Sequence, residues 1–390
     1  MNNTIKESDA KTKNHVNDLK GLNQLAQEGI LGVVDVVDSV HQSVLNLGGT
    51  LSQSKQTNGL TGFIYRSIRA TTRLSYRSIN FALSRFTPLL PDVLLTKRRD
   101  HWVAVLNGII GDHLAATDNP LALEMTLVYQ NQEISIRQAA ILWSNPNVKP
   151  LLLIHGLCLN AQSWQQKDHN HGQVLADSGH YLPIYLNYNS GLAIADNGRK
   201  LALLVSELDT LMEEQQKINV LAFSMGGLIV RSALQMAEKD NNLWPHRIEK
   251  LVFLGTPHQG ALLEKTGHLM EYILKISPYS APFVQLTQIR SQGIKDLRKG
   301  RIHDDGQSVQ LPRHIKSYAI AGTAKDDKAP HKEMLGDGLV TVNSALGRHP
   351  KKSRHTGIPK KHQFTVFHVS HLGLLSSKEV YDHLEKIFID

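Results

Sequence analysis

The stretch Asn219-Val220-Leu221-Ala222-Phe223-Ser224-Met225-Gly226-Gly227 decides the fold of this chain. Its first five residues form an apolar run that predicts a strand, and apolar residues at helical spacing follow as far as Met236. A serine on the tight turn between such a strand and helix projects its hydroxyl above the edge of a sheet. Small residues two positions away let the backbones approach, and Ser224 is the only serine with Gly or Ala at both such positions. The alternative is a serine that only caps a helix.

Outward from this turn, strand-like segments alternate with helical ones. Apolar runs of strand length lie at 125–129, 149–154, 181–188, 250–254, 315–321 and 363–367, and helical periodicity covers 194–214 and 377–388. The alternation predicts an α/β fold with a mainly parallel sheet, and strands this apolar suit a sheet with helices on both faces. Ligands of such sheets bind at the carboxyl ends of the strands, where the candidate residues fall.

Two residues further along the chain are candidates to activate Ser224. A serine hydroxyl needs a base, the base needs an acid to orient it, and this type of fold orders them serine, acid, histidine. We expect Asp337, which follows the strand at 315–321, to be the acid and His371, which follows the strand at 363–367, to be the base. Alternatives stay open: Asp326 or Asp327 as the acid, and His368, which we expect to pack against or cap the strand that it ends.

A third requirement is a pair of backbone N–H groups for the negative oxygen that forms when an ester carbonyl is attacked. We expect one from Met225, directly after the serine, and the other from Leu157, because Gly156 lets the preceding loop turn toward the site. His155 is expected to brace that loop through hydrogen bonds. Nothing marks Cys158 as an activated thiol, so a small buried residue is expected there.

These residues resemble the α/β-hydrolase superfamily. The motifs that carry the resemblance are His155-Gly156-Leu157, Phe223-Ser224-Met225-Gly226-Gly227, Gly255-Thr256-Pro257-His258-Gln259-Gly260 and Gly336-Asp337-Gly338-Leu339-Val340. Within the superfamily they look like bacterial triacylglycerol lipases and the branch that includes the GPI inositol-deacylases, over about residues 145–390. Ala222 departs from the usual Gly, and Phe223 from the usual His.

The resemblance implies a catalytic triad of Ser224, Asp337 and His371, with Leu157 and Met225 as oxyanion-hole donors. It also implies hydrolysis of carboxylic esters, with an ester or lipid-like small molecule as substrate and no organic cofactor. We therefore expect a serine hydrolase that works through an acyl-enzyme. The alternatives are an acyltransferase with the same triad and a non-catalytic scaffold that binds membranes.

The domain organisation predicted from the sequence has three parts. Residues 1–28 are polar and without a period, so no regular structure is expected there. Residues 29–120 have a helical pattern, and 121–390 form the α/β-hydrolase domain. Within it, the apolar insertion at about 261–306 is either a helical cap over an acyl pocket or a pair of ordinary packing helices.

Charge and composition limit the partners. The chain has 390 residues, 43 Lys+Arg against 35 Asp+Glu, and a formal charge of +8. A basic amphipathic helix is predicted at 64–86, either for contact with an anionic membrane or for packing on its own protein with solvated arginines. No nucleic-acid motif accompanies the charge, so nucleic acid is not expected as a partner.

One Cys excludes an intrachain disulfide and a multi-Cys metal cluster, and no metal site is expected. Without a targeting or spanning segment, we expect a cytoplasmic protein, at most peripheral to the inner face of the membrane.

Overall fold

The computed structural model describes residues 17–18, 20–28, 31, 66–75, 96–166, 168–178, 181–262, 290–303, 310–324, 336–351 and 354–389. Contacts divide the chain into two units. One unit comprises Met1–Leu95 and Thr117–Leu121, and the other comprises Thr96–Ala116 and Ala122–Asp390. The contacts thus group Thr96–Ala116 with the sheet, whereas the sequence analysis assigns these residues to the N-terminal helical region.

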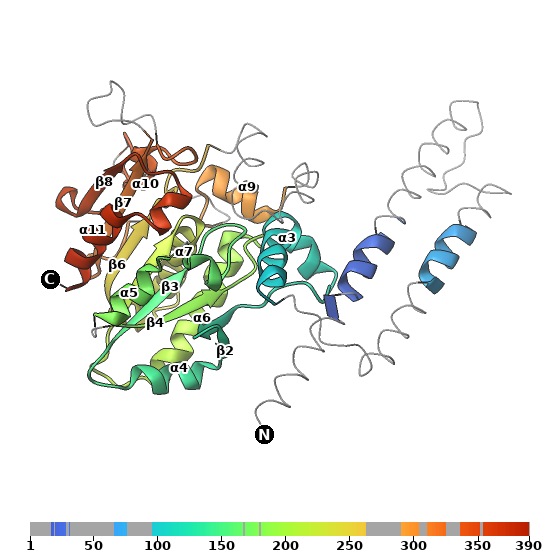
Figure 1. Cartoon of the computed structure of the whole chain (residues 1–390), viewed down its shortest axis with the longest axis horizontal. Helices are drawn as coiled ribbons and strands as arrows, with labels where there is room; N and C mark the ends of the chain where they lie inside the picture. Colours follow the sequence, from blue (N-terminus) through green and yellow to red (C-terminus); the bar gives the residue numbers. More distant parts are fainter. Residues whose placement is uncertain are drawn as a thin grey trace. The chain divides into compact units, whose positions relative to one another are not determined.

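The larger unit is built on one sheet of eight strands in the order β2-β1-β4-β3-β5-β6-β7-β8 (Figure 1). β1 pairs antiparallel with β2 and β4, and every other neighbouring pair is parallel. The strands are β1 Thr126–Tyr129, β2 Gln132–Ile134, β3 Lys149–Ile154, β4 Tyr181–Asn187, β5 Ile218–Phe223, β6 Ile248–Leu254, β7 Lys316–Thr323 and β8 Gln363–Phe367. The mainly parallel sheet predicted from the sequence is confirmed.

Helices connect the strands. The α-helices are α3 Thr96–Ala116, α4 Ile136–Trp143, α5 His171–Asp177, α6 Ile194–Leu211, α7 Met225–Lys239, α9 Gln292–Lys299, α10 Val342–Ala345 and α11 Lys378–Ile389. Short 3₁₀ turns are η2 Ala161–Trp164, η3 Trp244–Arg247, η6 Lys360–His362 and η7 Leu372–Leu375. Outside the insertion predicted at 261–306, each strand and helix that the sequence analysis names in this unit is present, with ends shifted by at most a few residues.

Helices cover both faces of the sheet because its central strands are apolar at consecutive positions. All six residues of β5 are buried. On one face Leu221 and Phe223 join a core cluster with residues of α5 and α11. On the other face Phe253, which alternates with cluster members of β6, lies against Gly227 of α7. The sheet is therefore the middle layer of three.

Several elements of this unit are absent from the sequence prediction. β2 has only three residues, too few for an alternating pattern to stand out. The start of α4 has a signal in the sequence: Ser135 accepts a hydrogen bond from the N–H of Gln138, whose side chain accepts one from the N–H of Ser135. This reciprocal capping box fixes the start of the helix.

In the smaller unit, residues 20–28 are helical, which corrects the expectation of no regular structure there. Polar side chains hold this helix against residues of the same unit. Gln24 Nε2 donates to the carbonyl oxygen of Thr117 at 2.9 Å, and Asn119 Nδ2 donates to that of Gly21 at 3.1 Å. Residues 66–75 are helical, inside the helix predicted at 64–86. Over the described part of the chain, every helix is too short or too polar to cross a bilayer.

Candidate active site

Ser224 occupies the sharp turn between β5 and α7. Its backbone has φ 53° and ψ −123°, a left-handed conformation that costs a residue with a side chain free energy. Two hydrogen bonds hold the turn: the N–H of Ser224 donates to the carbonyl of Leu254 at 2.8 Å, and that of Gly227 donates to the carbonyl of Ser224 at 3.1 Å. The turn aims the hydroxyl out of the carboxyl edge of the sheet, as the sequence predicts.

The structure brings Ser224, His371 and Asp337 together. His371 Nε2 lies 2.9 Å from Ser224 Oγ, and His371 Nδ1 lies 2.7 Å from Asp337 Oδ2. All three residues are buried, each 4% exposed. With Nδ1–H donating to the carboxylate, Nε2 carries the lone pair that faces the serine hydroxyl. The three residues have the mutual geometry of nucleophile, base and orienting acid.

The carboxylate of Asp337 is fixed from its other side. Its Oδ1 accepts backbone N–H bonds from Leu339 at 3.0 Å and from Val340 at 2.9 Å. The N–H of His371 donates in turn to the backbone carbonyl of Asp337 at 3.0 Å. Side chain and backbone of the acid therefore both set the position of the imidazole.

Of the alternative acid and base residues, the structure describes only His368. Asp326 and Asp327 lie outside the described residues. His368 directly follows β8 with φ 57°, so its backbone forms the turn that leads toward His371. A Cβ on Gly255 would lie 3.2 Å from His371 Cε1 and 3.3 Å from Asp337 Oδ2, and the φ of 56° at this position also favours glycine.

The two predicted oxyanion donors flank the serine. A Cβ on Gly156 would lie 3.0 Å from Ser224 Cβ, so the loop that carries Leu157 packs closely against Ser224. Met225 is the first residue of α7, and the N–H of a first helical residue has no acceptor within its helix. Both residues are buried, Leu157 at 1% and Met225 at 0% exposed. Their role in stabilising an oxyanion stays a prediction.

His155 makes the bracing contacts that the sequence analysis expects. Its Nδ1 lies 2.8 Å from the carbonyl oxygen of Gly156, and its ring stacks on that of Tyr188 at 4.2 Å between centroids. Tyr188 also donates its hydroxyl to the His155 carbonyl at 2.7 Å. Burial lowers the pKa of His155 to about 4, so the ring is neutral at pH 7. Cys158 is buried, and burial raises the pKa of its thiol, which keeps it unreactive.

Apolar side chains cover Ser224 and enclose little space. We call this space the Ser224 cavity; it measures about 10 Å³, roughly the minimum for one water. It is lined by Leu157, Ser224, Ala261, Leu297, Leu339, Val340 and His371. Ala261 and Leu297 belong to the insertion predicted at 261–306, and most of its predicted helical stretch, 263–289, lies outside the described residues.

One positioning contact near the triad has no signal in the sequence analysis. His171 Nε2 lies 2.9 Å from the carbonyl oxygen of Leu374, in the turn η7 that begins directly after His371. His171 Nδ1 lies 2.7 Å from His169 Nε2. Burial lowers the pKa of His171 to about 4, with a smaller lowering from His169. The neutral imidazole of His171 thus ties the turn of His371 to the start of α5.

Candidate metal ligands are the His, Cys, Asp and Glu side chains of the described residues. Within the ranges that the structure describes, no group of three or more His, Cys, Asp or Glu side chains could hold a metal ion.

Strand order and turn geometry together define the fold class. A serine at φ 53° between a central parallel strand and a helix, with acid and histidine after later strands, is the arrangement of one fold. The chain has the α/β-hydrolase fold.

A family model matches part of the chain. Residues 119–289, under half of the chain, match the model of a domain of unknown function, DUF7379. A search of the curated proteins finds no match.

Three solved structures illustrate the similarity. The mature lipase BlEst2 of Bacillus licheniformis has 19% identity and a TM-score of 0.43, over 63% of this chain and 93% of that one. A lipase-esterase related protein of Clostridium acetobutylicum has 16% identity and a TM-score of 0.38, over 63% and 96% of the two chains. A thermophilic esterase of Thermogutta terrifontis has 16% identity and a TM-score of 0.37, over 61% and 89%.

Proposed function

We propose that this protein is a serine hydrolase that cleaves carboxylic esters through Ser224, His371 and Asp337. The observation that carries the proposal is the pair of contacts in series, 2.9 Å from serine hydroxyl to imidazole and 2.7 Å from imidazole to carboxylate. Burial strengthens both interactions because little water competes with them. A serine that only capped a helix would need neither partner, and Ser224 makes no capping hydrogen bond through its side chain.

The reaction follows from the positions of the protons. His371 Nε2 takes the hydroxyl proton while Ser224 Oγ bonds to the ester carbonyl carbon, and the carbonyl oxygen becomes negative. The N–H groups of Leu157 and Met225 donate to that oxygen. The intermediate collapses as His371 gives its proton to the leaving alcohol, which leaves an acyl group on Ser224. Water then repeats the two steps, with its proton taken by His371, and releases the acid.

The surroundings of Ser224 favour an acyl group over a polar one. The described residues that line the Ser224 cavity beside the serine and the histidine are all apolar. A buried apolar lining binds hydrocarbon and rejects charge. A lipid-like or other acyl ester is therefore the proposed substrate class. An alcohol in place of water at the acyl-enzyme would make the same site an acyltransferase, and product analysis with added alcohol distinguishes the two.

A fluorophosphonate probe and a p-nitrophenyl ester test this proposal directly. The full-length protein should be labelled covalently and should hydrolyse p-nitrophenyl butyrate, and Ser224→Ala should lose both properties. Ser144→Ala is the matched control, because Ser144 is an exposed serine whose hydroxyl bonds only to the carbonyl of Ile141. Equal labelling of wild type and Ser224→Ala would contradict the role of Ser224. Absence of labelling and of turnover in the wild type would favour the non-catalytic scaffold.

Peripheral membrane contact is a second, separate proposal, and the helix at 66–75 carries it. Ile68 is 39% and Leu74 is 66% exposed, beside the exposed Arg66 and Arg73, whereas Arg69 is buried at 9%. Apolar and basic groups exposed together suit an anionic bilayer. The protein should pellet with phosphatidylglycerol vesicles, less so in high salt or after R66Q with R73Q, while K360Q with K361Q should not matter. Equal pelleting with phosphatidylcholine vesicles would contradict this.

A further inference from the structure

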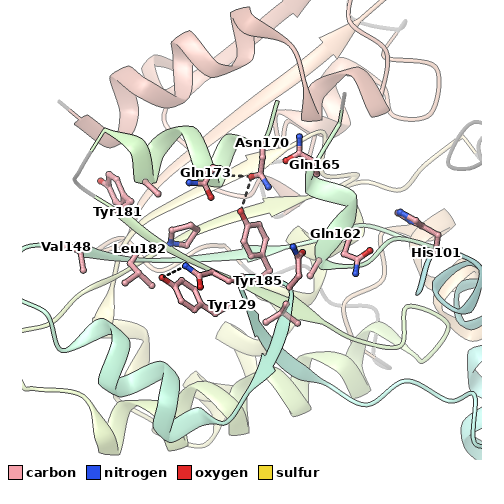
Figure 2. A pocket seen from close by; sticks show the side chains of 16 residues that line it. His101, Tyr129, Val148, Gln162, Gln165, Asn170, Gln173, Tyr181, Leu182 and Tyr185 are labelled. Carbon is pink, nitrogen blue, oxygen red and sulfur yellow. Dashed lines mark hydrogen bonds between the residues drawn. The ribbon is translucent and has the colours of Figure 1, made fainter. Parts of the chain in front are cut away.

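A groove of about 710 Å³ lies beside α5, over β1 and β4 (Figure 2). Its sixteen lining residues come from α3, β1 and the turn after it, the segment before β3, η2 and α5 with one residue flanking each, and β4. Among the described residues that line each, the groove and the Ser224 cavity have none in common. The volume falls in the usual range of small-molecule sites. The proposed esterase mechanism uses no residue of this groove, so the groove requires a separate functional explanation.

The lining of the groove is polar and without formal charge. Of the described residues that line it, none is Asp, Glu, Lys or Arg. The polar ones are Tyr129, Gln130, Asn131, Gln162, Gln165, Asn170, Gln173, Tyr181 and Tyr185. Burial also lowers the pKa of His101, against an opposing effect of Asp100, which leaves that ring neutral. We call this surface the amide groove. Charged groups lie next to this lining: Asp100 and Asp177 accept hydrogen bonds from Gln162 and Gln173, and Lys149 Nζ lies 5.8 Å from the ring centroid of Tyr181.

Three glutamine side chains of the amide groove are held by hydrogen bonds from their nitrogen atoms. Gln130 Nε2 donates to Tyr129 Oη at 3.3 Å. Gln162 Nε2 donates to Asp100 Oδ2 at 3.0 Å, and Gln173 Nε2 donates to Asp177 Oδ1 at 2.8 Å. With the nitrogen engaged, each amide keeps its carbonyl oxygen as an acceptor. A side chain fixed in advance loses less rotamer entropy when a ligand binds.

Asn170 presents the opposite polarity. Its Oδ1 accepts from the N–H groups of Gly172 at 2.9 Å and Gln173 at 3.2 Å, and from the hydroxyl of Tyr185 at 3.0 Å. The oxygen is thereby fully used, and the amide nitrogen Nδ2 remains as a donor. Figure 2 shows Asn170 above the ring of Tyr185, with Gln173 beside it on α5. The groove therefore combines fixed acceptors, a fixed donor and aromatic rings.

We infer that the amide groove binds a neutral saccharide. Each sugar hydroxyl both donates and accepts a hydrogen bond, which matches a wall that offers amide oxygens and an amide nitrogen. The rings of Tyr129 and Tyr185 supply flat apolar surface for the C–H face of a pyranose. The absence of formal charge among the described lining residues excludes phosphorylated and acidic sugars as preferred ligands, because their charge would be desolvated without a partner. A disaccharide such as maltose or cellobiose is the class of ligand expected.

Calorimetric titration of the full chain with maltose, cellobiose, lactose and trehalose tests this inference. At least one should bind in the millimolar range or tighter, and glucose 6-phosphate and glucuronate should bind at least tenfold more weakly. Gln162→Ala and Gln173→Ala should each weaken the bound disaccharide about fivefold, since each removes one hydrogen bond. Gln310→Ala, the same change at an exposed position outside the groove, should have no effect.

Two further outcomes keep this test separate from the esterase proposal. Ser224→Ala should bind the disaccharide as tightly as wild type, because the amide groove does not include Ser224. No heat of binding with any of the four sugars would overturn the inference. So would preferred binding of the charged sugars, or affinity that survives both Gln162→Ala and Gln173→Ala unchanged.

Discussion

The Ser224 cavity and the amide groove lie in the same unit and differ in size and in the polarity of the side chains that line them. The first encloses about 10 Å³ and the second about 710 Å³. The first surrounds a serine and a histidine with apolar side chains, and the second places neutral amides and tyrosines where water reaches them. Exclusion of water strengthens electrostatic interactions, which chemistry at a carbonyl needs. A wetted polar surface instead exchanges hydrogen bonds with a ligand at small net gain, which suits recognition.

The largest effect should come from Asp337, which belongs to the enclosed site only. Asp337→Asn should lower kcat/KM for p-nitrophenyl butyrate by roughly 10⁴-fold, because the amide favours the wrong histidine tautomer. Asp326→Asn and Asp327→Asn should leave the rate near that of wild type, and they serve as controls for the alternative acids. Loss of activity in one of these controls, with Asp337→Asn active, would assign the acid there instead. Disaccharide binding should be unchanged in all three variants.

A smaller effect is expected from protonation of His171. Its pKa is lowered from an ordinary 6.5 to about 4 in the folded protein. The contribution of the neutral ring to the free energy of unfolding is therefore complete above pH 6.5 and is lost as the pH falls toward 4, by up to about 3 kcal/mol. Urea unfolding at several pH values should show this loss, and His171→Gln should reduce it. His113→Gln, at an exposed position on α3, should leave the pH dependence unchanged. An identical pH dependence in His171→Gln would contradict the assignment.

The apolar enclosure of Ser224 should affect substrates by several-fold. Leu297→Ala enlarges the Ser224 cavity, so the ratio of kcat/KM for octanoate over acetate p-nitrophenyl esters should rise about threefold or more. The ratio is measured within each variant, which makes it independent of the amount of folded protein. Leu203→Ala on α6, where the side chain is 66% exposed, should not change it. An unchanged ratio in Leu297→Ala would mean that the acyl chain does not pass this side chain.

The smallest effect should be that of salt on the amide groove. Because a neutral disaccharide and the described lining residues carry no formal charge, the disaccharide affinity should stay within about twofold between low and molar salt. Calorimetry with the disaccharide that binds measures this directly. A tenfold loss in high salt would reveal an ionic contact and remove the reason for choosing a neutral sugar.

The sequence points to the candidate residues for a physical reason. Ser224, Asp337 and His371 each follow a strand, and the strand order brings the carboxyl ends to one edge. Short-range signals are enough to find such residues: an apolar run, a turn residue and a fixed order along the chain. The structure then brings these three side chains within hydrogen-bond distance.

The sequence does not predict the contacts that join distant segments. The bond from His171 to the carbonyl of Leu374 spans 203 residues, and the bonds that hold the helix at 20–28 reach residues 117 and 119. The amide groove is similarly scattered, because its residues come from several separate elements with no common period. In the sequence, isolated Gln and Asn residues look like ordinary surface residues, and only the fold shows that they lie together. Patterns of local spacing contain no information about such pairings.

The start of α5 has a consequence for anyone who would redesign this protein. Asn170 caps the helix and faces the amide groove, and His171, the next residue, bonds to the turn that follows His371. The seven residues of α5 therefore support both the amide groove and the turn that follows His371. We expect a substitution that tilts α5 to accommodate a larger sugar to displace the turn that follows His371 in the same movement. Engineering of one surface will therefore have to begin by immobilising the other.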